Sequence, residues 1–403
     1  MSTPLVVYDD AAARAFSPFS LTRPLATIRA GAELIGARWI RMLGATSAQF
    51  AASPHLATFS EPGAPTCARG TLRAGTVLAN SRCVAALNAA ADPSADVWHV
   101  DGVVAAIRLA RPLDADRLGD GSLDLASLAP PGGRAATIAG RWLRAVWDLI
   151  AQLPDQLSED TVALTAGARS SGNAAVERMG KHPIAIAASA QIDPFVLLDA
   201  SAGPIVIEAG ARVEAFTRIN GPCVIGEGTH LLSGRVMGSV IGDNCRVHGD
   251  VSTSIFVGHV NKAHEGFVGH TVVGRWANLG AGTTTSNLKN SYGPVKLWTP
   301  AGELDTGLTF LGSLIGDHAK LAIGTMLGTG TVVGAGANVF GTVRPPKRVP
   351  PFAWGDAPPY ETFSLDKFLD VAIRVMARRT VDLDPGQRAM LSAAHALAER
   401  AAW

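Results

Sequence analysis

Aliphatic residues recur at six-residue steps in two separate runs of this chain. The first run is Ile207, Val213, Ile219, Ile225 and Leu231, and the second is Ile315, Leu321, Leu327, Val333 and Val339. Between the two runs, Phe267, Val273 and Leu279 keep the same step. A period of six matches neither an α-helix nor an alternating strand. It is typical of a chain that turns a corner every six residues and points one side chain inward from each side, so we predict a hexapeptide-repeat parallel β-helix.

The composition limits the class of protein and of partner. The chain has 403 residues, of which 47% are hydrophobic and 17% charged, and this favours a well-buried protein of two domains. A net charge of +1 gives no support for a nucleic-acid partner. The four cysteines form no CxxC pair, and neither a signal peptide nor a membrane-spanning apolar run is present. We therefore expect a cytoplasmic protein with reduced thiols and no membrane partner.

Local patterns suggest how the chain is divided. In chain order we expect an α/β domain over residues 1–165, a linker over 166–183, the β-helix over 184–348 and a helical cap over 349–403. Leu34 to Leu43 has helical spacing, and Val97 to Val104 is typical of a strand. Residues 286–310 lack the six-residue step, and this predicts a loop that leaves the solenoid.

The densest group of polar residues lies inside the repeat region, at 261–270 and 278–290. A neutral imidazole such as that of His264 can take a proton from an attacking amine. Acyl transfer from a thioester also needs donors for the developing oxyanion, which the Asn287 amide or the backbone of Gly280–Gly282 would supply. The alternative is that these residues face solvent or form hydrogen-bonded ladders between coils.

These motifs resemble a known family. Lys262–His264 and Asn278–Asn287 resemble the acetyltransferase half of the bifunctional N-acetylglucosamine-1-phosphate uridyltransferase/glucosamine-1-phosphate N-acetyltransferase enzymes. The likeness is greater to a variant bacterial subfamily of sugar nucleotidyltransferases with C-terminal hexapeptide repeats, through Asn261–His270, Asn278–Tyr292, Asp305–Gly307, Tyr8–Asp10 and Leu21–Pro24. The resemblance implies a reduced nucleotidyltransferase-like α/β domain, a left-handed β-helix, a short C-terminal helical segment, acetyl-CoA as acyl donor and a homotrimer.

The resemblance also implies roles for individual residues. His264 stands where the family has its catalytic base, and Asn287 where a residue orients the reacting groups. Asn278 stands at an asparagine that binds the sugar phosphate. Ala281 and Gly282 lie in the loop near the thioester of acetyl-CoA.

The chain departs from the family pattern at two substrate contacts. Phe267 replaces a tyrosine that binds the sugar, and the lysine that meets the substrate phosphate has no counterpart, so we expect Arg246 or Lys262 to replace it. Lys347 and Arg348 follow the last coil, where they would meet the phosphates of coenzyme A. The alternative for this pair is a solvated basic turn.

The N-terminal half lacks the Gly-rich loop that normally cradles a triphosphate in nucleotidyltransferases. The candidate nucleotide ligands are Arg14, Arg23 and Arg29, and the candidate Mg²⁺ ligands are Asp9, Asp10 and Asp101. Each is equally compatible with a structural ion pair, so this domain is either a nucleotidyltransferase or a degenerate relative of one.

The leading hypothesis is an enzyme of sugar-nucleotide biosynthesis. It would acetylate an amino-sugar phosphate similar to glucosamine-1-phosphate, and its N-terminal domain would act as a UDP-N-acetylglucosamine diphosphorylase. One alternative is a zinc-dependent, carbonic-anhydrase-like β-helix enzyme, in which histidines of neighbouring chains form the site; the candidates are His259 and His264, with His248 and His270 nearby. The other is a scaffold without catalytic activity.

Overall fold

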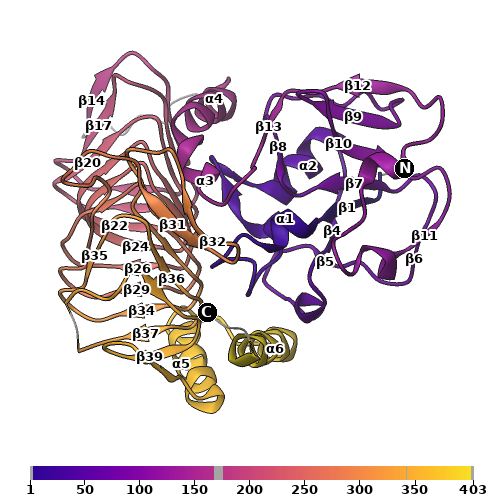
Figure 1. Cartoon of the computed structure of the whole chain (residues 1–403). Coiled ribbons are helices and arrows are strands. Elements are labelled where there is room, and N and C mark those ends of the chain that lie inside the picture. Colours follow the sequence, from indigo (N-terminus) through magenta and orange to yellow (C-terminus); the bar gives the residue numbers. More distant parts are fainter. Residues whose placement is uncertain (1–2, 168–175, 342, 401–403) are drawn as a thin grey trace. The chain divides into compact units, whose positions relative to one another are not determined.

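The computed structural model describes residues 3–167, 176–341 and 343–400 (Figure 1). Its contacts define two compact units, of which one comprises residues 1–146 with 383–397 and the other residues 147–382 with 398–403. The predicted domain boundaries at 165, 183 and 348 stay predictions. Part of the predicted linker, residues 168–175, lies outside the described residues.

The first unit is built on a seven-stranded mixed sheet. Its central parallel strands pair from Leu5 opposite Val77 to Tyr8 opposite Asn80, and every residue in them is buried, as expected of strands covered on both faces. In sheet order the strands are β12 (Ala135–Thr137), β9 (Val97–Val100), β10 (Val103–Arg108), β7 (Val77–Asn80), β1 (Leu5–Tyr8), β4 (Gln49–Ala51) and β5 (Thr66–Cys67). Three short pairs are β2 (Arg29–Ala30) with β3 (Glu33–Leu34), β6 (Thr71–Leu72) with β11 (Leu113–Asp114), and β8 (Cys83–Ala85) with β13 (Gly140–Trp142).

Helices α1 (Ala11–Arg14), α2 (Ile35–Leu43) and most of α6 (Pro385–Arg400) belong to this first unit. Helix α2 confirms the helical spacing, but the single strand expected over Val97–Val104 is wrong. That segment is a hairpin, because Asp101 and Gly102 both adopt positive φ angles (51° and 77°), as a tight turn between twisted strands requires.

The second unit is a parallel β-solenoid, the predicted left-handed β-helix (Figure 1). The strand pairing gives its coils three sides. The first side is a nine-stranded sheet of β15 (Ile184–Ile186), β18 (Ile205–Ile207), β21 (Cys223–Ile225), β23 (Val240–Asp243), β25 (Ile255–Gly258), β28 (Val272–Val273), β33 (Ser313–Ile315), β36 (Thr331–Val333) and β38 (Arg348–Val349).

The other two sides share a fourteen-stranded sheet, because β22 (His230–Met237) and β24 (Arg246–Ser252) each run around a corner. Its remaining strands are β14 (Glu177–Gly180), β16 (Gln191–Ile192), β17 (Leu197–Ala200), β19 (Arg212–Val213), β20 (Thr217–Asn220), β26 (Asn261–Lys262), β27 (Val268–Gly269), β29 (Asn278–Leu279), β34 (Lys320–Leu321), β37 (Asn338–Val339), β39 (Ala353–Gly355) and β40 (Glu361–Thr362). Strands β30 (Thr284–Thr285) and β35 (Met326–Leu327) continue the third side.

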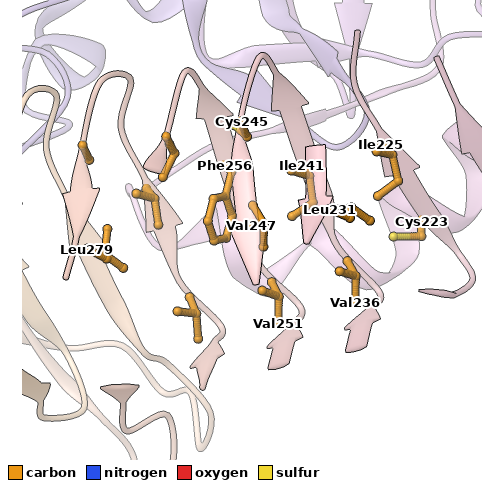
Figure 2. Packing of buried hydrophobic residues seen from close by; sticks show 14 of the residues in the cluster. Cys223, Ile225, Leu231, Val236, Ile241, Cys245, Val247, Val251, Phe256 and Leu279 are labelled. Atoms are coloured by element: carbon orange, nitrogen blue, oxygen red, sulfur yellow. The ribbon is translucent and has the colours of Figure 1, made fainter. Parts of the chain in front are cut away.

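The aliphatic residues of both six-residue runs form the core of the solenoid. All ten are at most 2% exposed, and they stack in columns, with Leu231 above Val213 and Val247 above Leu231. Figure 2 shows such side chains filling the interior of successive coils. Each buried aliphatic side chain contributes about 1.5–3 kcal/mol, so the columns are the main source of cohesion.

The middle coils are shorter than eighteen residues. Ile225, Ile241 and Phe256 lie opposite one another in steps of 16 and 15 residues. In the next coil the inward residues Lys262, Val268 and Val273 are six and then five residues apart, so one side has lost a residue. The inward position predicted for Phe267 is therefore wrong, because Phe267 is only half-buried and Val268 fills the core beside it.

The segment over residues 286–310 leaves the solenoid, as predicted. It carries the antiparallel hairpin of β31 (Lys296–Thr299) and β32 (Gly302–Asp305). The N–H of Leu311 donates to the Asn287 carbonyl at 2.9 Å and closes the base of this insertion.

Three helices accompany the solenoid. Helices α3 (Asp148–Ala151) and α4 (Leu153–Thr165) come first, and α4 packs against β18 and β21. Helix α5 (Leu365–Ala377) was expected to cap the last coil, but it covers a flank instead. Its Phe368 ring lies 5.9 Å from the ring of His318 and 5.0 Å from that of Phe352, which lies two coils later. The edge of the last coil pairs with the antiparallel strand β40. Within the described ranges, no helix is long and apolar enough to cross a membrane.

Candidate functional site

A lysine occupies one position in an otherwise aliphatic core column. Lys262 lies opposite Val247 and is fully buried. Its ammonium donates to the backbone carbonyls of His248 (3.3 Å), Glu265 (2.8 Å) and His264. Burial lowers the pKa of Lys262 to about 8. Because an ammonium has three donors, these contacts favour a structural role for Lys262 over the expected contact with a substrate phosphate.

The corner held by Lys262 carries His264, which is exposed. The corner of the next coil stacks directly on it, with the Gly282 N–H donating to the Glu265 carbonyl at 3.2 Å. Gly266 permits this close approach, since a Cβ there would lie 2.2 Å from the Thr283 carbonyl oxygen. The fold therefore brings the expected base and the expected thioester loop together.

Two of the expected backbone oxyanion donors, those of Gly280 and Gly282, are already engaged. The Gly280 N–H donates to the Leu321 carbonyl at 3.0 Å, and the Gly282 N–H is engaged as described. These bonds belong to the ladder between coils, so the side chain of Asn287 is the better candidate for polarising a carbonyl.

Asn287 forms a specific pair with a histidine. Its side-chain N–H donates to Nδ1 of His270 at 2.8 Å, and the His270 ring stacks on Phe310 at 5.3 Å. Burial lowers the pKa of His270, which favours the neutral ring that accepts this bond. His270 also has a φ of 48°, a left-handed conformation that non-glycine residues seldom adopt.

His264 and Asn287 lie at opposite ends of one side of the solenoid. His264 precedes β27, whereas Asn287 follows β30 in the next coil. The two strands are joined where the Gly269 N–H donates to the Thr285 hydroxyl at 3.0 Å. The resemblance assigns His264 and Asn287 to one reaction, but in the structure the length of one side of the solenoid separates them.

The expected sugar-phosphate contacts lie on the second side of the solenoid, which contains β26, β29 and β34. Asn278 accepts a hydrogen bond from the side chain of Asn261 at 2.8 Å. Arg246 is in register with Asn261 in the preceding coil, and Lys320 with Asn278 in the next. These outward positions place Arg246 on the same face as Asn278, whereas Lys262 points inward.

The two basic residues expected at coenzyme A differ in their surroundings. Lys347 is exposed. The Arg348 guanidinium lies 4.4 Å from the ring centroid of Trp298, which belongs to the inserted hairpin. This cation–π contact fixes the hairpin to the last coil. Trp298 carried no sequence signal, because the insertion has no repeat from which its position follows.

The three arginines expected at a nucleotide are held by protein atoms. Arg14 donates to three backbone carbonyls. Arg23 forms a buried ion pair with Glu61 at 2.8 Å, and Arg29 donates to the Ala32 carbonyl at 2.8 Å. These contacts match the alternative that the sequence left open, in which such residues stabilise the fold.

The three aspartates expected at Mg²⁺ do not form a suitable set. Asp9 is buried, and burial raises its pKa to about 6. Burial also opposes ionisation of Asp10, but hydrogen bonds from Arg82 and Asn80 outweigh it and lower the pKa of that carboxyl. Asp101 is exposed in the β9–β10 turn. A protonatable buried acid, an acid paired with arginine and a turn residue do not fit the ligand set that Mg²⁺ requires.

The histidines of the zinc alternative are dispersed. His259 stacks on Trp276 at 4.0 Å, whereas His270 binds Asn287 at another corner. In the part of the chain that the structure describes, no three His, Cys, Asp or Glu residues are placed to hold a metal ion.

The first unit has a cavity of about 320 Å³ where its parallel strands end. Asp10 follows the end of β1, and Asn80 is the last residue of β7. Arg82 forms an ion pair with Asp10 at 2.6 Å, and its guanidinium lies 5.6 Å from the Trp142 ring. Arg144 lines the same cavity. Ligands of open α/β sheets bind at the carboxyl ends of the strands, so Arg82 and Arg144 are better placed for a phosphate than the arginines expected from the sequence.

Sequence reasoning also missed the basic residues Lys320, Arg378 and Arg379. They line a cavity of about 210 Å³ between the solenoid and the end of α5. Lys320 is in register with Asn278, but the insertion separates the two by 42 residues. A constant repeat could therefore not have paired them.

Comparisons with known proteins agree with this architecture. Residues 5–169 match the family model described as sugar nucleotidyl transferase. An uncharacterized acetyltransferase, YaiX, of Escherichia coli O6:K15:H31 (strain 536 / UPEC) is 27% identical over 147 residues, which span 36% of this chain and 64% of that protein. The bifunctional protein GlmU of Jannaschia sp. (strain CCS1) is 26% identical over 164 residues, or 38% of this chain and 32% of GlmU. A bifunctional sugar-1-phosphate nucleotidylyltransferase/acetyltransferase of Sulfurisphaera tokodaii is 29% identical over 91 residues, or 23% of each chain.

The chain thus resembles sugar nucleotidyltransferases and acetyltransferases, as its motifs predict. The matched parts span less than two thirds of each of these relatives.

Proposed function

We propose that this chain is a transferase of sugar-nucleotide biosynthesis. Its solenoid would transfer the acetyl group of acetyl-CoA to the amine of an amino-sugar phosphate such as glucosamine-1-phosphate. One observation carries the proposal, namely the stacking of the His264 corner on the Gly282 corner of the next coil. The names of the relatives agree with it.

In the proposed reaction the amine nitrogen attacks the thioester carbonyl carbon. His264 takes the proton that the nitrogen loses, the C–S bond breaks, and coenzyme A leaves as the thiol after receiving that proton. An amide donor such as Asn287 would stabilise the oxyanion of the tetrahedral intermediate.

The distance between the His264 and Asn287 corners favours a site shared between chains. We propose a homotrimer in which the His264 corner of one chain meets the Asn287 or Arg348 region of another. Exposed apolar side chains at one corner of the last coils support an interface there: Ile323 (76% exposed), Met326 (46%), Phe340 (37%) and Val343 (54%). Sedimentation equilibrium of the full chain tests this, and a monomer at micromolar concentration would contradict it.

The acetyltransferase proposal is tested by thiol release from acetyl-CoA with glucosamine-1-phosphate as acceptor. Replacing His264 by Ala should abolish release, whereas Glu265→Gln, a change of an exposed neighbour on the same corner, should keep it. Equal activity of H264A and the wild type would exclude His264 as the base. No release with any amino-sugar phosphate would overturn the proposed acyl transfer.

A second activity is favoured by the family match over residues 5–169 and by the cavity where β1 and β7 end. We propose that this cavity binds the phosphates of a sugar phosphate or nucleotide through Arg82 and Arg144. The test is pyrophosphate release from UTP and N-acetylglucosamine-1-phosphate. Activity that is lost in Arg144→Gln and kept in Arg14→Gln would assign phosphate binding to this cavity. The reverse pattern would assign phosphate binding to the arginines expected from the sequence, Arg14, Arg23 and Arg29.

A further inference from the structure

A pocket lies on the second side of the solenoid, under helix α5. Its volume is about 210 Å³. On the solenoid side it is lined by His259, Asn261, Trp276, Ala277, Asn278 and Lys320, and on the helix side by Val371, Val375, Arg378 and Arg379. All of these residues belong to one compact unit.

The solenoid wall of the pocket is held in place by its own ladder. Asn261, Asn278 and Lys320 project from the same register position of three successive coils. The rings of His259 and Trp276 stack at 4.0 Å beside them. A wall made of stacked coils keeps its donors in fixed positions, as a binding site requires.

The opposite wall is anchored as well. Phe368 near the start of α5 packs edge-on against His318 and Phe352 of the solenoid. At the other end of the helix, Arg379 approaches the Asn261 carboxamide oxygen at 3.4 Å. The helix is thus tied down on both sides of the pocket, and Arg378 and Arg379, which directly follow its last residue, line the cavity.

The pocket gathers positive charge without an acid among its lining residues. Lys320 donates to the carbonyls of Trp276 (2.6 Å) and His318 (3.0 Å), and burial lowers its pKa to about 7. The pKa of Arg379 is lowered first by burial and then by the charges of Arg246 and Arg378. Like charges held together in a partly buried site repel one another, and a bound anion would relieve that repulsion.

We propose that this pocket binds a phosphate group through Lys320, Arg378 and Arg379, and that its ligand is the phosphate of the amino-sugar acceptor. Guanidinium groups bind phosphate oxygens in pairs, and Asn261 and Asn278 offer amide groups to the sugar hydroxyls. The proposal of a phosphate site is supported by the pocket alone, whereas the identity of its ligand rests on the proposed acetyltransferase function.

The position of the pocket along the chain suits this acceptor. Asn261 is three residues before His264, so at most about 10 Å of extended backbone separates the pocket wall from the exposed imidazole. An acceptor whose phosphate is bound under α5 would extend its sugar along β26 toward the His264 corner. Helix α5 then supplies the cations for the substrate phosphate that the sequence comparison expected from the solenoid.

The test is calorimetric titration of the full chain with inorganic phosphate, glucosamine-1-phosphate and glucosamine. The double variant Arg378→Gln/Arg379→Gln should bind both phosphates at least about tenfold more weakly than the wild type. The matched control is Arg374→Gln, which removes one charge from the same helix at a side chain that is 76% exposed and pairs only loosely with Asp370, at 3.8 Å. This control should bind as the wild type does.

Each outcome decides between defined alternatives. Unchanged phosphate affinity in a double variant that unfolds cooperatively would overturn the proposed site, as would a wild type that binds neither phosphate. Glucosamine-1-phosphate binding no more tightly than inorganic phosphate would overturn the assignment of the acceptor. If the double variant loses phosphate binding and the wild type releases no thiol from acetyl-CoA, the pocket stands and the proposed acetyltransferase function fails.

Discussion

The ammonium of Lys262 donates to the backbone carbonyl of His264 from inside the solenoid core. The side chain that occupies an aliphatic position thus holds the corner on which the proposed base is displayed. A buried charge is costly unless its donors are satisfied, and here two carbonyls of the His264 corner and the His248 carbonyl of the preceding coil satisfy them. The position of His264 therefore depends on the interior of the coil as much as on its surface.

Replacing Lys262 by Met should loosen this corner without unfolding the protein. Methionine fills the column, but each carbonyl it leaves unpaired costs about 1–3 kcal/mol. We expect faster amide hydrogen exchange confined to residues 263–266, and acetyl transfer at least about tenfold slower. Leu279→Met, at the neighbouring inward position, is the matched control and should change neither. Unaltered exchange in Lys262→Met would contradict the role assigned to the lysine.

The pH dependence of stability should report the same lysine. The folded pKa of Lys262 is about 8, below the ordinary value of 10.5, so between these pH values the unfolded chain binds more protons than the folded one. Lys262 therefore lowers stability below pH 8 and ceases to do so as the pH rises to 10.5. Urea unfolding at pH 7 to 10 should show the difference between wild type and Lys262→Met shifting in favour of the wild type as pH increases. A pH-independent difference would mean that this lysine is not perturbed.

The pair of His270 and Asn287 predicts that the rate of acetyl transfer falls at acidic pH, as an acid limb of the pH–rate profile. Protonation of His270 converts Nδ1 from an acceptor to a donor and breaks the bond to the Asn287 amide. Because burial lowers the pKa of His270, the bond should survive to below pH 6.5. Nitrogen NMR of the imidazole and the rate profile should change together, and His270→Gln should remove this limb. A wild-type rate that is constant while the imidazole titrates would separate the pair from catalysis.

Phe267→Tyr would restore the hydroxyl that the family resemblance expects at the sugar. The Phe267 ring is half-buried and packs over Gly269. Because this side chain already reaches the surface, a hydroxyl can be added to the ring without burying it in the core. We expect a KM for the amino-sugar phosphate that is lower by a factor of about 3–10, with kcat little changed, since one hydrogen bond is worth about 0.5–1.5 kcal/mol. Phe310→Tyr, on the ring that stacks with His270, is the control and should leave KM unchanged. An unchanged KM in Phe267→Tyr would place the sugar elsewhere.

Trp298→Ala should weaken the last coil at the proposed acyl-donor site. The Arg348 guanidinium loses its aromatic partner at 4.4 Å, a contact worth about 0.5–2 kcal/mol. We expect a higher KM for acetyl-CoA and an unchanged KM for the acceptor in steady-state kinetics. Lys296→Ala, an exposed change on the same hairpin, separates this effect from general loosening. A rise in the acceptor KM alone would contradict the assignment of Arg348.

The sequence by itself determined the solenoid and the candidate base. Inward positions recur because each side of a coil must bury one aliphatic side chain. The six-residue spacing is therefore visible in the sequence wherever the coils keep eighteen residues. The prediction for Phe267 failed because the side from Val268 to Val273 spans five residues instead of six, and a shortened side leaves no local signal in the sequence.

Only the tertiary structure decided which polar residues meet. Lys320 faces Asn278 across an insertion, and Arg378 and Arg379 reach the same pocket from a helix that the sequence placed at the end of the solenoid. Lys262, which its charge suggested for a substrate phosphate, is buried because the strand periodicity points it inward. The chemistry of a side chain depends on the residue alone. The direction in which that side chain points and the residues that it contacts depend on the length of the coils and on where distant helices pack. Coil length and helix packing are fixed only when the whole chain has folded.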